Sequence, residues 1–128
     1  MTTNYRDVPE LQKYIDLVEN EGKNGVKKCC KWQKKLIKFV KKCFENENLT
    51  IDTEQLKKYM GLQKYFDFEL FEWEQFVFTL HCCVFREDGL PRFPDLLIFV
   101  ARGAGKNGYL AFEDFAMISP YSNLQQYD

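Results

Sequence analysis

The sequence lacks the features that would assign it at once to the membrane, disordered or strongly basic classes of protein. No apolar run approaches the roughly 18 residues that a membrane-spanning helix needs, so we expect no membrane contact. Neither sign of charge dominates, because 18 Lys and Arg residues oppose 19 Asp and Glu residues, and any attraction to nucleic acid must therefore be local. With 45% hydrophobic residues among 128, the chain is expected to fold as a domain-sized unit with an aromatic-rich core.

The cysteines lack the C-x-x-C spacing of metal and redox motifs, their number is odd, and no secretory leader precedes them. We therefore expect reduced thiols. His81 stands beside two of them, but adjacent residues of a helix point about 100° apart and cannot easily bind one metal ion. The expected role of the thiols is to line the core or the surface. The five cysteines are Cys29, Cys30, Cys43, Cys82 and Cys83.

Apolar residues at three- and four-residue steps predict two helices in the first half of the chain. The first begins at Pro9, because proline is favoured at the first helical position. The second runs from about Val26 to Phe44. We expect the packing faces to carry Leu11, Tyr14, Ile15 and Val18 in the first helix, and Cys29, Cys30, Gln33, Leu36, Ile37, Val40 and Cys43 in the second.

The other face of the second helix is unusually basic. Nine lysines and no acidic residue lie between Lys23 and Lys42. Two interpretations stay open, a solvated lysine face and a face that binds DNA phosphates or a partner. Lysine without arginine or interleaved aromatic residues is weak evidence for the reading of a DNA groove.

A shorter third helix has clear boundary signals. Asp52 or Thr53 stands at its start, Gln55 follows Asp52 in the capping-box position, and Gly61 comes just past its end. These residues predict a helix of about nine residues that is closed at both ends.

An alternation of aromatic and acidic residues from Phe66 to Leu70 predicts a short extended segment. A largely buried helix is expected next, from about Glu72 to Val84, because bulky apolar residues occur on all its sides. The turn residues Asp88, Gly89 and Pro91 end this region.

The pattern in the last third of the chain predicts a strand, a glycine-rich loop and a helix, in that order. Five consecutive apolar residues, 96–100, have the pattern of a strand buried on both faces of a parallel sheet. A small-residue loop, Arg102–Gly108, follows directly. A helix is then expected to continue to Ser119, with Leu110, Ala111, Phe115 and Ala116 as its apolar pattern.

Such a loop makes a phosphate site because small residues let backbone N–H groups converge and the helix dipole attracts an anion. Lys106 adds a positive charge. The P-loop order G-x-x-x-x-G-K-[ST] is matched only in part, because Val100 stands at the first glycine and Asn107 at the hydroxyl residue. An Asn amide oxygen is a neutral ligand, so Mg²⁺ binding at Asn107 has weak support.

A competing motif occupies the same loop. Gly103, Gly105 and Gly108 also spell G-x-G-x-x-G, which would suggest a dinucleotide-dependent oxidoreductase. That fold needs an acid at the end of a second strand about 20 residues later, and Asp128 has the spacing but no strand before it. A glycine turn with a chance lysine is the third possibility.

Several of these motifs, taken in order, resemble the N-terminal part of the large subunit of tailed-phage terminases, the ATP-driven motor and nuclease that packages and cuts viral DNA. That family has an adenine-contacting aromatic segment, an Arg-Phe pair, a buried strand and a variant P-loop that begins with a basic residue. The matching residues here are Leu70–Gln75, Arg92 and Phe93, 96–100 and Arg102–Gly108.

The resemblance implies an α/β P-loop ATPase fold, of which this chain holds the N-terminal portion: a helical region over 1–64 with the basic helix, and the start of the ATPase domain over 65–128. It implies ATP and Mg²⁺ as cofactors. Trp73 would pack near the base, Glu74 or Gln75 would contact adenine, and Arg102, Gly103, Ala104, Gly105, Lys106, Asn107 and Gly108 would form the phosphate loop.

In such ATPases the acidic strand that holds Mg²⁺ and the carboxylate that activates water lie downstream of the P-loop. The nuclease residues would follow later still. We therefore expect the front end of a longer ATPase and endonuclease, with no catalytic residue in this stretch and little ATPase activity of its own. The expected partners are double-stranded viral DNA, the terminase small subunit and the portal protein, in the cytoplasm of a host bacterium. The alternatives are a small helical DNA- or protein-binding module that uses Lys23–Lys42, and a dinucleotide-binding oxidoreductase fragment.

Overall fold

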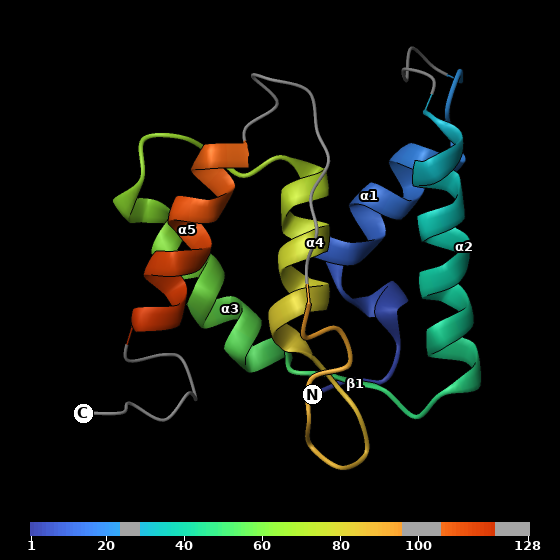
Figure 1. The fold of residues 1–128 in the computed structure, drawn as a ribbon. Coiled ribbons are helices and arrows are strands. Elements are labelled where there is room, and N and C mark those ends of the chain that lie inside the picture. The colour runs from blue at the N-terminus through green and yellow to red at the C-terminus, as the bar shows by residue number, and fades with distance from the viewer. Residues whose placement is uncertain (24–28, 96–105, 120–128) are drawn as a thin grey trace.

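The structure is a computed structural model that describes residues 1–23, 29–95 and 106–119 (Figure 1). The predicted strand at 96–100 and the loop residues 101–105 lie outside these ranges. The helices are η1 (Tyr5–Asp7), α1 (Pro9–Glu19), α2 (Lys31–Asn46), α3 (Thr53–Gly61), η2 (Leu62–Tyr65), α4 (Glu72–Cys83) and α5 (Lys106–Ile118), and the strands are β1 (Thr50–Ile51) and β2 (Val84–Phe85).

The starts of α1 and α3 follow the sequence signals closely. α1 begins with Pro9 in the first turn, as predicted. α3 begins after Asp52, whose Oδ1 accepts a hydrogen bond of 3.1 Å from the backbone N–H of Gln55. The predicted end is wrong by one residue, because Gly61 is the last residue of α3 and has a φ of -62°. The chain therefore continues from Gly61 into η2 with no left-handed cap.

α2 begins at Lys31, later than the predicted Val26. Cys30 has extended backbone angles, φ -75° and ψ 163°, and its N–H donates to the side-chain oxygen of Gln33 at 2.9 Å. This N-terminal cap starts the helix, although apolar spacing continues toward the N-terminus. Cys30 is exposed and so lies off the packed face that we expected for it.

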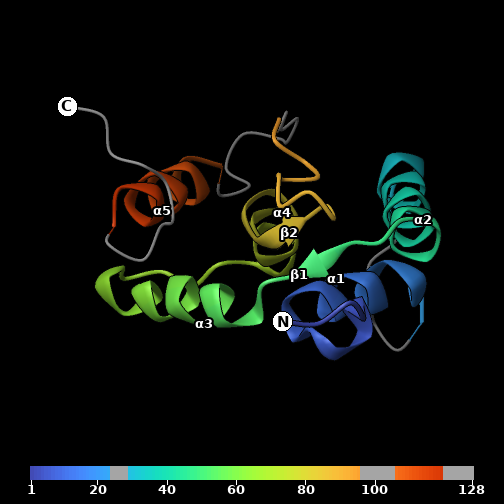
Figure 2. The ribbon, with the colours of Figure 1, turned by 90° about the horizontal axis from the view of Figure 1, so that it is seen from below.

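α4 occupies the centre of the molecule, between α1 and α2 on one side and α3 and α5 on the other (Figure 1). Seen from below, α5, α4 and α2 form a row that α1 and α3 cover (Figure 2). Phe76 of α4 packs on Tyr14 of α1 at a ring distance of 4.9 Å, and Phe78 contacts Tyr59 of α3 at 5.3 Å. The predicted burial of this helix is confirmed, since neighbours surround it.

The described sheet has two short antiparallel strands, with Thr50 opposite Phe85 and Ile51 opposite Val84. Gly89 has a φ of 82°, so the predicted turn is present after β2. Residues 66–68 form a bend that pairs with no described strand, and the extended segment predicted from Phe66 to Leu70 is therefore not a β-strand.

α5 is present as predicted, but its packing face is different. The buried residues are Tyr109, Phe112, Glu113 and Ala116, whereas Leu110 and Phe115 are 41% and 36% exposed. Ala116 is buried as expected, but the ring of Phe112 lies 5.3 Å from that of Phe78, so α5 packs on α4 through Phe112 and not through Leu110, Ala111 or Phe115.

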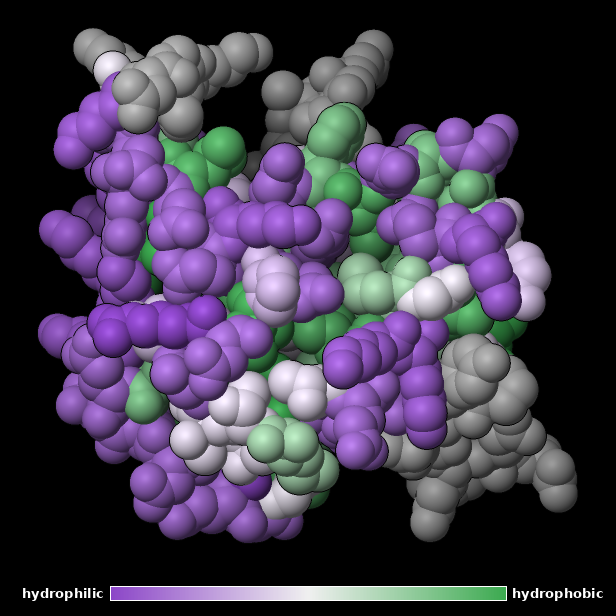
Figure 3. Space-filling view, turned by 180° about the vertical axis from the view of Figure 1, so that it is seen from behind, coloured by the Kyte–Doolittle hydropathy of each residue, from purple (hydrophilic) through white to green (hydrophobic). Residues whose placement is uncertain are grey.

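The described residues thus form a mainly helical fold with one small sheet, and the α/β P-loop architecture remains a prediction. A single core of buried residues runs from Tyr5 to Ala116, across the expected boundary between 64 and 65. On the face that α1 and α3 cover, hydrophilic residues predominate and hydrophobic ones show between them (Figure 3). No helix in the described ranges combines the length and apolarity that a membrane crossing requires.

Candidate functional site

The aromatic motif of the candidate nucleotide site and the helix after the glycine loop meet at the N-terminal turns of α4 and α5. Trp73 lies in the first turn of α4, and its ring is 6.1 Å from that of Tyr109 in α5, with an interplanar angle of 35°. Tyr109 comes three residues after Lys106, the first residue of the helix. The contact therefore brings the aromatic motif beside the helix that follows the glycine loop. Arg102, Gly103, Ala104 and Gly105 lie outside the described residues.

Glu74 caps α4. Its side chain is 2% exposed, and its Oε1 accepts a 2.8 Å hydrogen bond from the backbone N–H of Phe71. Burial raises the pKa of the Glu74 carboxyl, while the bond from Phe71 acts in the opposite direction. A side chain that is enclosed and bonded in this way stabilises the helix start.

Gln75 has a different environment from its neighbour. Its Nε2 donates to the carbonyl oxygen of Leu70 at 2.9 Å, which fixes the orientation of the amide. Among the described residues, its side-chain oxygen accepts no hydrogen bond within 3.5 Å. Since Gln75 is only half-buried, it retains an acceptor that Glu74 does not offer.

At the start of α5, Asn107 is exposed and Gly108 is closely approached by another segment. A Cβ atom at Gly108 would lie 3.3 Å from two ring carbons of Phe68. This glycine therefore lets the bend at 66–68 lie directly against the first turn of α5. The side chain of Lys106 is not described.

Beyond the first turns of the two helices, a polar cluster joins α4 to α5. The Nε2 atom of His81 lies 3.1 Å from Oε1 of Glu113, and its Nδ1 lies 2.8 Å from the carbonyl oxygen of Phe93. The Glu113 carboxylate raises the pKa of His81 by accepting a hydrogen bond, against the effect of burial. Cys82 donates to the same carboxylate oxygen, with a sulfur–oxygen distance of 3.7 Å.

The cluster of His81, Cys82 and Glu113 stabilises the packing of α4 on α5 and is not suited to catalysis. Burial is the main cause that raises the pKa values of the Cys82 thiol and the Tyr109 hydroxyl far above their ordinary values. Both groups therefore stay protonated at neutral pH, and a protonated thiol is a poor nucleophile. His81 uses both ring nitrogens in contacts within the protein. Within the described ranges, no group of three or more His, Cys, Asp or Glu side chains is arranged to hold a metal ion.

An open depression of about 390 Å³ lies on the surface near the bend, lined by Gln63, Lys64, Phe66, Asp67, Phe68 and Glu69. Its two acidic side chains oppose one lysine, so it does not attract an anionic phosphate.

Arg92, from the Arg-Phe pair, forms an ion pair away from this depression. Its Nε and Nη2 donate to both carboxylate oxygens of Glu47, at 2.7 and 3.1 Å. This ion pair connects the segment after β2 to the end of α2.

Sequence reasoning missed two features of the structure. The His81–Glu113 pair joins residues 32 positions apart in the sequence, and no local pattern marks such a contact. The second feature is an exposed apolar row on α2, at Trp32, Leu36 and Phe39; the prediction that Leu36 lies on the packing face is wrong, because its side chain is 38% exposed. The four- and three-residue spacing of this row was a usable signal for a second apolar face of the helix.

No protein-family model, curated protein sequence or solved structure matches this chain.

Proposed function

We propose that this chain is the ATP-binding front part of a terminase large subunit from a tailed phage. The observation that carries the proposal is the contact between Trp73 and Tyr109. The motif expected to contact adenine and the helix expected to follow the phosphate loop are more than 30 residues apart, and they lie side by side. A nucleotide needs both elements in one place, since its base and its phosphates are parts of one small molecule.

In this proposal Gln75 contacts adenine and Glu74 supports the helix start. The free side-chain oxygen of Gln75 suits the exocyclic amino group of adenine, whereas Glu74 is enclosed. Arg102 and Lys106 neutralise phosphate oxygens, with Gly103, Ala104, Gly105 and Gly108 shaping the loop. Bound ATP supplies the phosphoryl group, and Mg²⁺ would neutralise its charge.

The exposed amide of Asn107 is one neutral oxygen donor, and Mg²⁺ prefers several oxygen ligands, carboxylates and phosphates among them. Asn107 therefore does not bind Mg²⁺ without the nucleotide. The parent protein would act on double-stranded viral DNA with the small subunit and the portal protein, in the host cytoplasm, and these partners follow from the family alone.

A direct test uses the two tryptophans of the chain. Replacing Trp32 by Phe leaves Trp73 as the single indole, so its emission reports events at the proposed adenine side. Titration of this variant with ATP and Mg²⁺ is expected to give a saturable change in emission. Lys106→Ala is expected to abolish the change, and Lys64→Ala, an exposed lysine of η2, is expected to retain it.

Equilibrium dialysis with labelled ATP provides a second measurement that does not depend on fluorescence. If Lys106→Ala and the parent chain retain ATP equally, or if NAD⁺ binds more tightly than ATP, the proposal fails. A reading frame that continues past Asp128 into an apolar strand ending in Asp-Glu would support the ATPase assignment, because that strand holds the metal in such enzymes.

A further inference from the structure

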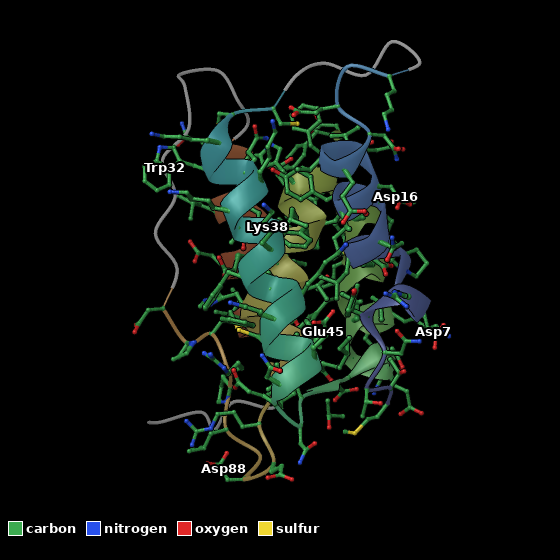
Figure 4. The ribbon with its side chains drawn as sticks, turned by 90° about the vertical axis from the view of Figure 1, so that its right-hand side faces the viewer. Asp7, Asp16, Trp32, Lys38, Glu45 and Asp88 are labelled. Atoms are coloured by element: carbon green, nitrogen blue, oxygen red, sulfur yellow. The ribbon has the colours of Figure 1, made fainter. Side chains whose placement is uncertain are left out.

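α2 carries an exposed apolar row on the surface that it turns away from the core. Trp32 is 65% exposed, Phe39 is 51% exposed and Leu36 is 38% exposed. Their spacing of four and three residues places them along one side of the helix. Figure 4 shows Trp32 projecting from the first turn of α2. Large apolar side chains that gather on one exposed face mark interaction surfaces.

A row of lysines runs beside the apolar row. Lys31, Lys35, Lys38 and Lys42 are all exposed, and their steps of four, three and four residues keep them on one side of α2 over about 16 Å. Lys38 lies on the outward surface in Figure 4. No acidic group of the described ranges lies within 4.0 Å of these four amines.

The remaining two lysines of α2 have a different role. Lys34 forms an ion pair with Glu21, and Lys41 forms one with Glu19 of α1. The helix therefore separates its cations into an inner pair with acidic partners and an outer row without them. Of the residues outside the described ranges, only Asp128 is acidic, so those segments bring almost no charge that would balance the outer row.

The two outer rows are joined at Trp32. The amine of Lys31 lies 5.2 Å from the centre of its ring, and that of Lys35 lies 4.8 Å away. Such cation–π contacts hold an exposed ring against the lysines. A nucleic-acid base that stacked on a ring face covered by one of these amines would have to displace it.

We propose that this outer face of α2, formed by Trp32, Leu36, Phe39 and the four outer lysines, binds an acidic amphipathic helix of a partner protein. Such a helix matches both rows at once. Its apolar residues would pack on the aromatic row, and a parallel row of carboxylates would pair with the lysines. The proposal depends on α2 alone and is independent of the nucleotide site.

Two other classes of partner fit the face less well. A nucleic-acid strand would pair with the lysines, but a base on the ring face that Lys31 or Lys35 covers would displace that amine, and Leu36 would have no role. A lipid surface takes helices with a broad apolar face, and here the core side of α2 is already packed through Ile37, Val40 and Cys43.

Fluorescence anisotropy with the whole chain tests the proposal. The probe is a synthetic labelled helix of about 18 residues, long enough to form in water, with a leucine row beside a glutamate row. We expect saturable binding, and at least about tenfold weaker binding of a peptide with the same residues in shuffled order. The combined variant Lys31→Gln, Lys35→Gln, Lys38→Gln and Lys42→Gln should lose about tenfold in affinity, because four exposed ion pairs are removed.

The matched control changes four exposed lysines on other elements, Lys13→Gln, Lys57→Gln, Lys58→Gln and Lys64→Gln, and should bind as the parent does. Trp32→Ala with Phe39→Ala should also weaken binding, and its circular dichroism should be unchanged because both side chains are exposed. Equal binding of the shuffled peptide would overturn the proposal. Tighter binding of phosphatidylserine vesicles, or of a DNA single strand of about 20 nucleotides, would assign the face to another partner and also overturn it.

Discussion

The Nε2 atom of His81 in α4 lies 3.1 Å from the Oε1 atom of Glu113 in α5. The other ring nitrogen faces the carbonyl oxygen of Phe93 at 2.8 Å, so both nitrogens are directed at acceptors. An imidazole that donates from both nitrogens is the protonated form. The pair therefore attaches the last described helix to the central one through a charge that depends on pH.

This arrangement predicts that stability falls as pH rises above the ordinary pKa of histidine, about 6.5. The pKa of His81 is raised in the folded state by Glu113, by Phe93 and, from a distance, by Asp95. A raised pKa means that the folded state holds the proton more tightly, so the stabilisation is complete below the unfolded pKa of about 6.5 and is lost as pH rises through the folded pKa. Urea unfolding between pH 6 and pH 9 measures it. Cys82 does not titrate there, because burial keeps its pKa far above this range.

Glu113→Gln provides the control for this dependence. At pH 6 the substitution is expected to lower the free energy of unfolding by about 1–3 kcal/mol, the contribution of a hydrogen bond between charged groups. At pH 9 the parent and the variant should differ less. An equal difference at both pH values would contradict the prediction, because it would show that the contribution of the pair does not change between pH 6 and pH 9.

The thiols are predicted to differ strongly in reactivity. Burial is the main cause that raises the pKa of Cys83 from 9.0 to about 12, and the thiol is fully enclosed. Its thiolate fraction near pH 8 is therefore about a thousandfold below that of an ordinary cysteine. Cys30 is exposed, so iodoacetamide should label it first.

Mass spectrometry of the labelled peptides follows each cysteine separately. In urea, Cys30 and Cys83 should react at similar rates, because unfolding removes the burial. If Cys83 in the folded chain reacts as fast as Cys30, α4 does not enclose its thiol.

The N-terminal cap of α3 allows us to predict how much the free energy of unfolding falls when the cap is removed. Asp52→Ala removes the side-chain acceptor of the Gln55 N–H and should lower the free energy of unfolding by about 1 kcal/mol. Asp52→Asn keeps an acceptor and should cost less. Glu54→Ala, an exposed residue in the same turn, is the matched control in denaturant titrations. Equal stability of Asp52→Ala and the parent would contradict the role of this cap.

Local signals predicted the helices well and their packing less well. Pro9, Asp52 and the apolar run of α4 mark their own elements, since caps and periodicity act over a few residues. The register of α5 was wrong, because contact of Phe112 with Phe78 selects the buried face and this contact is distant in sequence. The spacing of apolar residues in α5 is compatible with two neighbouring packing faces, and contact with α4 determines which of them is buried.

The candidate site was predictable as two motifs but not as a contact. Glu74 and Gln75 looked equivalent in sequence, and only the burial of Glu74 and its bond to Phe71 separate their roles. Trp73 lies in α4 and Tyr109 in α5, more than 30 residues later, and no local sequence pattern predicts a contact between them. Their proximity follows from the position of α4 at the centre of the core.

Gly108 should tolerate alanine but not valine. Alanine is favoured over glycine in a helix by up to about 1 kcal/mol. Its Cβ would meet the Phe68 ring at 3.3 Å, but that ring is 37% exposed and can move outward by a few tenths of an ångström. Gly108→Ala is therefore expected to change the free energy of unfolding by less than about 0.5 kcal/mol, in the stabilising direction.

Gly108→Val adds two methyl groups against the same ring and should destabilise the fold by about 1–2 kcal/mol. The control is the double substitution with Phe68→Ala, in which the added bulk meets no ring. Chemical denaturation of the four proteins forms a complete cycle. A coupling energy near zero would show that Phe68 does not pack on α5, because valine would then have the same effect with and without the ring.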